Sequence, residues 1–296
     1  MGPEKLELNP KQYERIITFG CSWTEFLWPT WANVISDILE VPLFNQGTAG
    51  IGNVAILHKM LAWKLEYGFN DTDLVLVNWS YFHREDRIKN GYWRSGGNVV
   101  TSRFYDAKFV RNYWDAENDF VKNAGAIIMA NEMFNIAYQS RISSANNYDS
   151  ETSWLEQHST PWYNKWHSEI SHIKYFELLE NEKDWYKLIY DTHPSILSHA
   201  NHAIKIANHL GFKDTDRLNK VKEAYTDLHD NIERDLKSVS PRTIAKTNKK
   251  HGSDTGFVKH FVPIVVSKNL KKLNMSVDFQ GYGYDTHLSL KSWHGL

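Results

Sequence analysis

Short apolar runs alternate with stretches of helical periodicity in the N-terminal part of this chain. The clearest run is Leu74 to Val77, an unbroken aliphatic segment between two polar segments. Strand patterns also occur at 15–19 and 41–44, and apolar residues recur at helical spacing in 31–39 and 54–65. Strands that alternate with helices form a parallel sheet covered by helices on both faces. We therefore expect an α/β fold.

The composition argues against several classes of protein. The 296 residues include 34 Lys and Arg against 35 Asp and Glu, so the basic excess of a nucleic-acid-binding protein is missing. No window approaches the roughly 18 apolar residues of a membrane span, and residues 1–10 lack the apolar core of a signal peptide. The single cysteine, Cys21, excludes an internal disulfide framework. We expect a cytoplasmic protein with no nucleic-acid partner.

Aromatic residues are unusually frequent. The chain has 12 Trp, 15 Tyr and 14 Phe, and many of them lie between Tyr81 and Tyr190. Most are expected in the core, but Trp and Tyr side chains also stack against sugar rings. We interpret residues 87–184, where the regular alternation fades, as a large aromatic-rich insertion into the α/β domain.

The pattern within this insertion predicts only a few elements. A hairpin is expected within 90–105, a long helix over 116–139 and a loop over 146–160. No convincing fourth parallel strand is evident between Arg141 and Lys187.

Two helices are predicted after the insertion. Pro194 at a first helical position and Gly211 after the last one delimit a helix over 196–210. A second helix over 215–236 has an apolar seam. This seam either packs on the domain or forms a contact in a homodimer.

The C-terminal part is expected to be an extension of the α/β domain. Residues 238–256 are polar and basic, so we expect a mobile linker there, and 257–296 would form a small terminal segment. The sequence thus predicts an α/β domain over 1–213 and a helical extension over 214–296.

A strand that ends at Gly-x-Ser can present a serine hydroxyl at the carboxyl edge of a sheet. Gly20-Cys21-Ser22 follows the first predicted strand, so Ser22 is a candidate nucleophile. A serine hydroxyl is a poor nucleophile until a base takes its proton, and an imidazole held by a carboxylate is such a base. Asp191-Thr192-His193-Pro194 offers both groups, and the similar segment Tyr284-Asp285-Thr286-His287 offers a rival pair.

Taken in order, these motifs resemble the SGNH/GDSL hydrolase superfamily, in particular its divergent and often phage-encoded branches. The motifs that carry the resemblance are Gly20 to Thr24, Asn45 to Gly50, the strand at 74–77 and Asp191 to Ser195 before a helix. The resemblance covers residues 15–86 and 185–211. It implies a three-layer, flavodoxin-like fold with a parallel sheet.

The resemblance also implies an esterase mechanism without a metal or an organic cofactor. Ser22 would be the nucleophile, His193 the general base and Asp191 the residue that holds the imidazole. Asp285 and His287, which lack a following Pro and helix, are a second choice for the pair. The Asp-x-His spacing also resembles the O-acetyltransferase relatives of this superfamily, so acyl transfer stays open beside hydrolysis.

An oxyanion hole is implied by the same resemblance. Its donors would be the backbone N–H of Ser22, Gly50 and, in the family, an Asn of a third motif. In this chain the third motif reads Asn78-Trp79-Ser80, which puts Ser80 where that Asn should be. The other donors that could serve instead are Asn78, His83 and Arg84. The missing Asn leaves open a third reading, a degenerate fold that only binds a glycan or a protein.

The expected substrate is an oxygen ester, with a small acyl group such as acetyl on a carbohydrate as the favoured class. Side chains expected to bind it are Trp23, Asn53, Trp79, Tyr81 and Arg84. A phage-encoded chain could also be associated with a virion. His199 and His202 are spaced i, i+3, but no carboxylate stands at ligand spacing beside them, so no metal site is expected.

Overall fold

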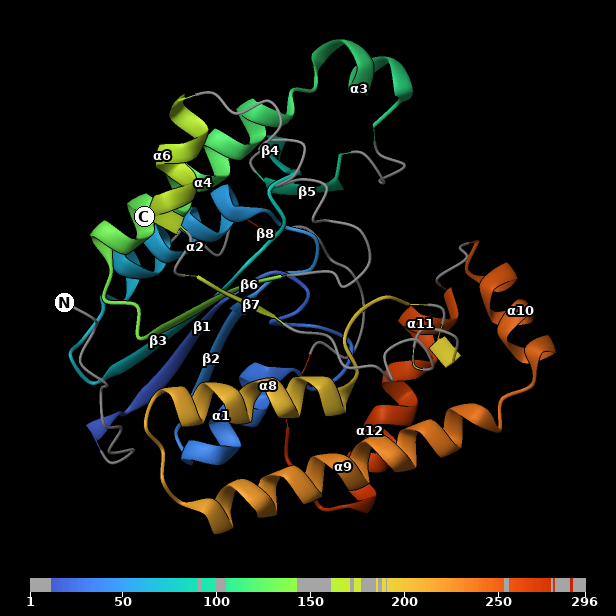
Figure 1. Ribbon diagram of the computed structural model, residues 1–296. Coiled ribbons are helices and arrows are strands. Elements are labelled where there is room, and N and C mark those ends of the chain that lie inside the picture. Colours follow the sequence, from blue (N-terminus) through green and yellow to red (C-terminus); the bar gives the residue numbers. More distant parts are fainter. Residues whose placement is uncertain are drawn as a thin grey trace. The chain divides into compact units, whose positions relative to one another are not determined.

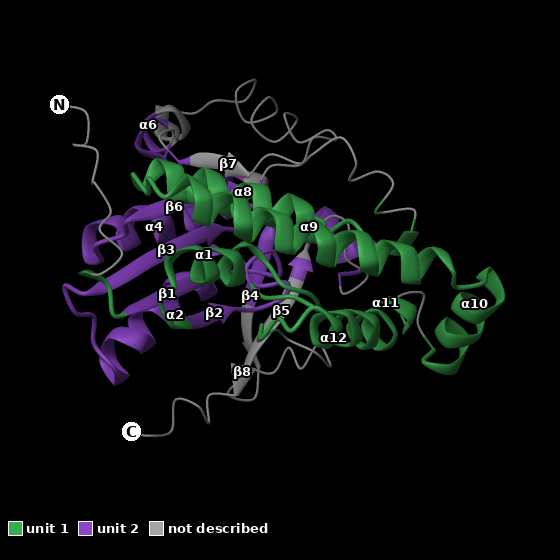
Figure 2. Ribbon diagram, turned by 90° about the horizontal axis from the view of Figure 1, so that it is seen from below, with its two compact units in different colours: residues 1–14, 25–43, 178–284 green, residues 15–24, 44–177, 285–296 purple. Residues whose placement is uncertain are grey.

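The chain divides into two compact units, which are described separately below (Figure 2). Unit 1 consists of Met1–Glu14, Glu25–Leu43 and Leu178–Tyr284, and unit 2 of Arg15–Thr24, Phe44–Glu177 and Asp285–Leu296. Both units are assembled from separate stretches of sequence, whereas the domains predicted from the sequence, 1–213 and 214–296, are continuous. The computed structural model describes residues 12–89, 92–99, 105–142, 161–170, 173–176, 185, 188–189, 191–252, 256–277, 279 and 288–289.

A five-stranded sheet with the order β2-β1-β3-β6-β7 lies in unit 2 (Figure 1). The strands β1 (Arg15–Gly20), β3 (Asp73–Trp79), β6 (Tyr138–Ile142) and β7 (Lys174–Phe176) pair in parallel. With β2 (Leu43–Gly47) next to β1, the strands follow the 2-1-3-4-5 order of flavodoxin-like folds. The predicted α/β class with a parallel sheet is confirmed.

The two central strands, β1 and β3, are buried and largely apolar. Such continuous apolar runs are typical of parallel strands that are covered on both faces. Their register pairs Gly20 with Asn78, so both strands end at the same edge of the sheet. Ser22 and Ser80 each follow two residues beyond this last pair.

Helices α2 (Asn53–Glu66), α4 (Ala116–Met133) and α6 (Pro161–Ile170) lie side by side on one face of this sheet (Figure 1). The helix predicted over 116–139 is too long, because the backbone becomes extended at Phe134 and residues from Tyr138 onward pair with β3. The structure also has a parallel strand, β7, between Arg141 and Lys187, where the sequence shows no convincing strand pattern. β7 has only three residues, which is too short to leave a recognisable pattern.

A second, antiparallel sheet in unit 2 has the order β4-β5-β8. Its strands are β4 (Arg84–Lys89), β5 (Tyr92–Asn98) and β8 (Leu288–Ser289), and a short helix, α3 (Ala107–Tyr113), follows β5. A hairpin was expected within 90–105, but its first strand begins earlier, at Arg84. The loop expected over 146–160 lies outside the described residues.

Helix α9 (Thr215–Lys237) packs on α1 (Trp31–Leu39), α8 (Ile196–His209) and α12 (Val262–Lys272) in unit 1. Its apolar seam is buried, so the seam is covered within the chain itself. The Tyr225 hydroxyl in this seam donates a 2.6 Å hydrogen bond to Asp37 on α1. None of the helices among the described residues is long and apolar enough to cross a membrane.

Two details of unit 1 differ from the sequence-based expectation. Helix α8 begins at Ile196, as the predicted range 196–210 requires, but Pro194 lies before the helix, because the Ser195 side chain accepts a hydrogen bond from Ser198 N and acts as the N-cap. The segment expected to be a linker forms α10 (Pro241–Lys250) and leads into α11 (Gly256–His260). Ser240 caps α10 and Pro241 occupies its first turn, which are strong helix-start signals.

Candidate active site

Ser22 lies in a tight turn directly after β1 in unit 2. Thr24 N donates a 2.9 Å hydrogen bond to Cys21 O across this turn, and Ser22 is almost completely buried. A Cβ atom on Gly20 would lie 2.0 Å from Thr24 Oγ1 and 2.8 Å from Asn78 O. Glycine is therefore the residue that lets the chain turn back so closely, and it sets Ser22 at the carboxyl edge of the sheet.

Asn45, in the middle of β2, fixes the Ser22 turn from the neighbouring strand. Its side-chain N–H donates to Thr24 O (2.8 Å), and its Oδ1 accepts from Thr18 Oγ1 (2.9 Å) and from Gly47 N (3.0 Å). Asn45 begins the motif Asn45 to Gly50, but the sequence alone assigns this residue no role. Its position at the start of that motif was the only available signal.

The glycine-rich loop after β2 is held in place from helix α2. Lys59 Nζ donates to Gln46 O (2.5 Å) and to Thr48 Oγ1 (2.7 Å). Gly50 has a φ of 82°, in the left-handed region that glycine adopts without strain. The loop that carries the second predicted oxyanion donor thus has a defined backbone shape.

Asn53 joins this loop to the end of β3. Its Oδ1 accepts from Ser80 N (2.7 Å), and its Nδ2 donates to Ser80 O (3.2 Å). Asn53, expected to contact substrate, is fully buried, so we assign it to positioning of the backbone. Asn78 Nδ2 donates to Ser140 Oγ (2.8 Å), whereas the buried Ser80 hydroxyl makes no hydrogen bond within the described residues.

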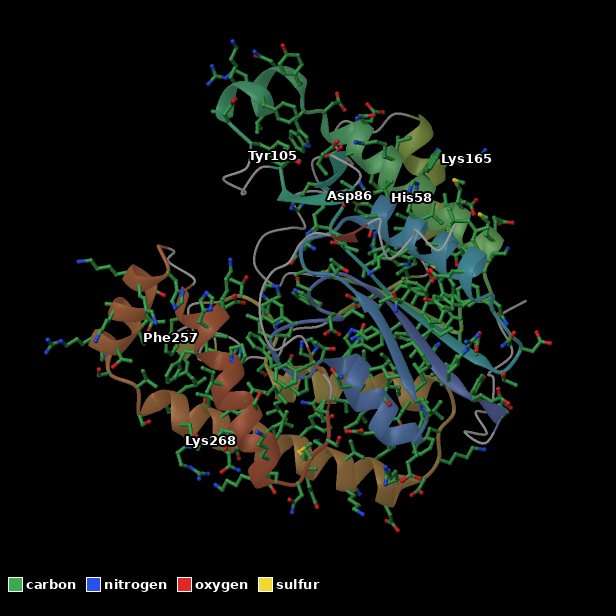
Figure 3. All side chains as sticks on the ribbon, turned by 180° about the vertical axis from the view of Figure 1, so that it is seen from behind. His58, Asp86, Tyr105, Lys165, Phe257 and Lys268 are labelled. Atoms are coloured by element: carbon green, nitrogen blue, oxygen red, sulfur yellow. The ribbon has the colours of Figure 1, made fainter. Side chains whose placement is uncertain are left out.

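The start of β4 attaches to the N-terminus of α2. Arg84 donates to Ile51 O (3.1 Å), and the Asp86 carboxylate accepts from Gly52 N (2.7 Å) and Ala55 N (2.9 Å). Figure 3 labels Asp86 beside the helix that carries His58, which is α2. Burial raises the pKa of Asp86 to about 6, although the two backbone hydrogen bonds and the Arg84 charge act in the opposite direction.

The remaining side chains expected to bind substrate differ in their exposure. Trp23 and Trp79 are buried, and Trp79 Nε1 donates to Gln139 Oε1 (2.9 Å), so Trp79 belongs to the core. Tyr81 is partly exposed, and the Arg84 guanidinium lies 5.3 Å from the centre of its ring. Burial and the nearby Arg84 charge lower the pKa of His83, an alternative donor, to about 4.

Asp191 and His193 form a hydrogen-bonded pair in unit 1. His193 Nδ1 contacts Asp191 Oδ1, and the same oxygen accepts from His193 N (2.8 Å). The second bond is the local turn that an Asp side chain makes with the backbone two residues on, which explains the Asp-x-His spacing. Both side chains are partly exposed, His193 by 17% and Asp191 by 11%.

Aromatic side chains fix the plane of the His193 ring. Phe26 stacks on it with ring centroids 3.8 Å apart. Trp28 lies edge-on to the same ring and donates from Nε1 to Pro194 O (3.0 Å). Residue 26 carried no signal in the sequence, because its contact with residue 193 forms only in the folded chain.

The Asp191 carboxylate is kept in its charged form. Burial alone would raise its pKa, but the His193 charge, the two hydrogen bonds from His193 and the Lys259 charge together hold the pKa below its ordinary value. An ionised carboxylate at Nδ1 fixes the ring tautomer and stabilises the imidazolium that forms when the other nitrogen, Nε2, takes a proton.

Asp285 and His287, the second choice for the pair, lie outside the described residues. Within the described ranges, no group of three or more His, Cys, Asp or Glu side chains is placed to hold a metal ion.

Comparisons with known proteins found similar solved structures only. No family model matches the chain, and no curated protein matches it. One similar structure is assigned to the lipolytic G-D-S-L family, from Desulfitobacterium hafniense DCB-2 (13% identity, TM-score 0.38, 67% of this chain and 99% of the other). Another is a lipolytic G-D-S-L family member from Veillonella parvula DSM 2008 (12%, 0.35, 69% and 98%). A third is a gut microbial diltiazem-metabolizing enzyme (11%, 0.38, 72% and 50%).

The two G-D-S-L proteins carry the name of the superfamily that the sequence motifs resemble. At these identities and TM-scores, the chemistry of this chain has to be argued from its own residues.

Proposed function

We propose that this chain is a serine-dependent ester hydrolase in which Ser22 is the nucleophile, His193 the general base and Asp191 its orienting carboxylate. The observation that carries the proposal is the Asp191–His193 pair, in which one carboxylate oxygen binds both the ring and the backbone of the histidine. This is how serine hydrolases keep an imidazole ready to accept a proton. The Ser22 turn at the carboxyl edge of a parallel sheet supplies a hydroxyl at a typical catalytic position.

The proposed reaction has two halves. Ser22 Oγ attacks the ester carbonyl while its proton passes to His193 Nε2, and a tetrahedral oxyanion forms. The bond to the alkoxide then breaks, the alkoxide takes the proton from His193, and an acyl-Ser22 ester remains. Water repeats the attack with His193 as base, which releases the carboxylic acid and restores the serine.

The oxyanion would be stabilised by three donors at the same edge of the sheet. We assign the Ser22 N–H, the Gly50 N–H and the Ser80 hydroxyl to this role. Asn78 is the weaker choice for the third donor because its amide already donates to Ser140, whereas Ser80 Oγ is buried with no bond in the described residues. A buried hydroxyl without a partner is costly, and a role in binding the oxyanion would explain it.

We propose a small acyl group, such as acetyl, on a carbohydrate as the substrate. Support comes from Tyr81, a partly exposed ring that directly follows Ser80. Tyrosine rings stack against the apolar faces of sugars.

The test is covalent labelling with a fluorophosphonate, which reacts only with an activated serine. Wild type is expected to label, Ser22→Ala to lose labelling, and the exposed-serine control Ser276→Ala to label like wild type. A wild type that stays unlabelled, or a Ser22→Ala variant that still labels, would contradict the proposal. The first result would favour a fold that only binds its ligand.

Two further comparisons refine the assignment. His193→Ala is expected to abolish hydrolysis of p-nitrophenyl acetate, whereas His287→Ala is expected to retain it; the reverse would move the pair to Asp285 and His287. Release of free acetate, measured against transfer of acetyl to an added sugar, separates hydrolysis from acyl transfer.

A further inference from the structure

We propose that the ester substrate is carried on an anionic polymer, which the chain holds through a basic stripe on α10. This inference rests on the proposed function, because it names the substrate class of the same site. The basic stripe consists of Arg242, Lys246, Lys249 and Lys250.

The four residues of the basic stripe share one face of the helix. Their spacing is i, i+4, i+7 and i+8, which places them within one side of an α-helix. All four are exposed, and none makes an ion pair or hydrogen bond within the described residues. Figure 3 shows long nitrogen-tipped side chains extending outward from this helix, next to the Phe257 label.

The opposite face of α10 is the one that packs. Ile244, Thr247 and Asn248 lie there, and these three are only partly exposed. Asn248 Oδ1 accepts from Phe257 N (2.6 Å), so α10 caps the start of α11. Gly256 approaches the end of α10 so closely that a Cβ atom would lie 3.0 Å from His251 Cβ. The basic stripe is therefore held with a fixed outward orientation.

Electrostatic interactions connect the end of α10 with α11, and α11 with the Asp191–His193 pair, within unit 1. The rings of His251, after α10, and His260, on α11, stack with centroids 3.7 Å apart. Lys250 and Lys259 both act on His260 electrostatically, and Lys259 also acts on Asp191. The charges of Lys250, in the basic stripe, and of Lys259, on α11, thus lie along an electrostatic connection from the stripe to the carboxylate of the pair.

The local charge is strongly unbalanced. Residues 241–272 contain eight Lys or Arg residues and one acidic residue, Asp254, in a chain whose net charge is −1. A concentration of one sign of charge near a site attracts ligands of opposite charge and raises their rate of association. An acyl group on a neutral sugar would gain nothing from this arrangement, whereas an acylated polyanion would.

The stripe fits an acidic glycan better than a membrane or a nucleic acid. The apolar residues that a membrane-binding helix would insert are absent from its outer face, and its inner face packs on α11. It also has no aromatic side chain on which a base could stack.

The test compares two esters, O-acetylated polygalacturonate and O-acetylated xylan, with p-nitrophenyl acetate as the reference substrate. Wild type is expected to show a lower KM for the acidic polymer than for xylan at low salt. The variant Lys246→Glu/Lys249→Glu should raise the KM for the acidic polymer on the order of tenfold relative to its activity on the small ester. The difference should disappear at about 1 M salt, where the Debye length is about 3 Å.

Matched variants separate charge from fold. Lys246→Arg/Lys249→Arg keeps the charge and should retain the wild-type KM. Lys220→Glu/Lys222→Glu makes the same charge change at exposed positions of α9 in the same unit and should change neither activity. Circular dichroism checks that each variant is folded.

Three outcomes would overturn the inference. The first is an equal KM of wild type for the two polymers. The second is an unchanged KM of Lys246→Glu/Lys249→Glu for the acidic polymer. The third is that Lys246→Glu/Lys249→Glu loses binding to DNA or to anionic vesicles, measured by co-sedimentation, while its KM for the acidic polymer stays that of wild type. If p-nitrophenyl acetate hydrolysis is itself independent of Ser22, the proposed function fails, which this reference assay shows separately.

Discussion

The buried contact between Asp86 and the start of α2 gives a prediction about stability and pH. Burial raises the pKa of Asp86 from 3.8 to about 6. A carboxyl whose pKa is higher in the folded state stabilises the fold fully below its unfolded pKa, and this stabilisation is lost as the pH rises through about 6. The unfolding free energy of wild type should therefore fall between pH 4 and pH 7.5 because of this group.

The magnitude follows from the size of the shift. One pKa unit corresponds to about 1.4 kcal/mol, so the change from 3.8 to about 6 amounts to roughly 3 kcal/mol. A series that starts at pH 4, just above the unfolded pKa of 3.8, misses the first part of this titration, so the expected change is roughly 2 kcal/mol. In Asp86→Asn the side chain is neutral at every pH, so this contribution to the pH dependence is absent.

The assay is urea-induced unfolding of both proteins at a series of pH values, followed by tryptophan fluorescence. The difference in unfolding free energy, wild type minus Asp86→Asn, should decrease by roughly 2 kcal/mol from pH 4 to pH 7.5. Titration of buried histidines affects both proteins equally and cancels in this difference. Asp71→Asn, at an exposed position before β3, serves as the control and should leave the pH profile unchanged. A difference that stays flat or increases with pH would refute the reasoning.

Three further changes test other parts of the structure. Gly20→Ala should lower the unfolding free energy by about 1–3 kcal/mol, because the new Cβ would overlap Thr24 Oγ1; an unchanged melting temperature would argue against the tight turn. Ser80→Ala should lower kcat for p-nitrophenyl acetate on the order of a hundredfold while the enzyme stays folded, and an unaffected kcat would remove Ser80 from the oxyanion hole. Burial lowers the pKa of His202 to about 3, so the unfolded state binds its proton first as the pH falls below 6.5. His202→Gln should therefore lose less stability than wild type between pH 7 and pH 5, by about 2 kcal/mol, and equal losses measured by urea unfolding would contradict this.

The parts of the fold that the sequence predicted correctly are those whose burial leaves a local pattern. β1 and β3 are buried and their sequences are largely unbroken apolar runs, and α9 has an apolar seam at helical spacing. β7 could not be predicted, because three residues contain no measurable period. The sequence of α10 is mostly polar, which favours a linker, and only Ser240 and Pro241 at its start indicate a helix.

In the candidate site, contacts between residues close in sequence could be predicted, and contacts between distant residues could not. The Asp191–His193 contact is local, because the carboxylate reaches a backbone N–H two residues on, so a three-residue motif was enough to suggest it. The contacts of Asn45 with Thr24 and of Asp86 with the start of α2 join residues that are far apart in sequence. No single-sequence pattern marks such partners, since each is a common polar residue beside an ordinary strand.

The interleaved arrangement of the two units affects how this protein can be synthesised. Helix α1 leaves the ribosome early, but the helices that cover it in unit 1, α8 and α9, are made only after Ile196. During translation the apolar side of α1 stays uncovered for most of the chain, which exposes it to aggregation or to capture by chaperones. Fragments that end before α8 should accumulate as insoluble material. Slower synthesis of the full chain should therefore improve the yield of folded protein more than truncating the chain.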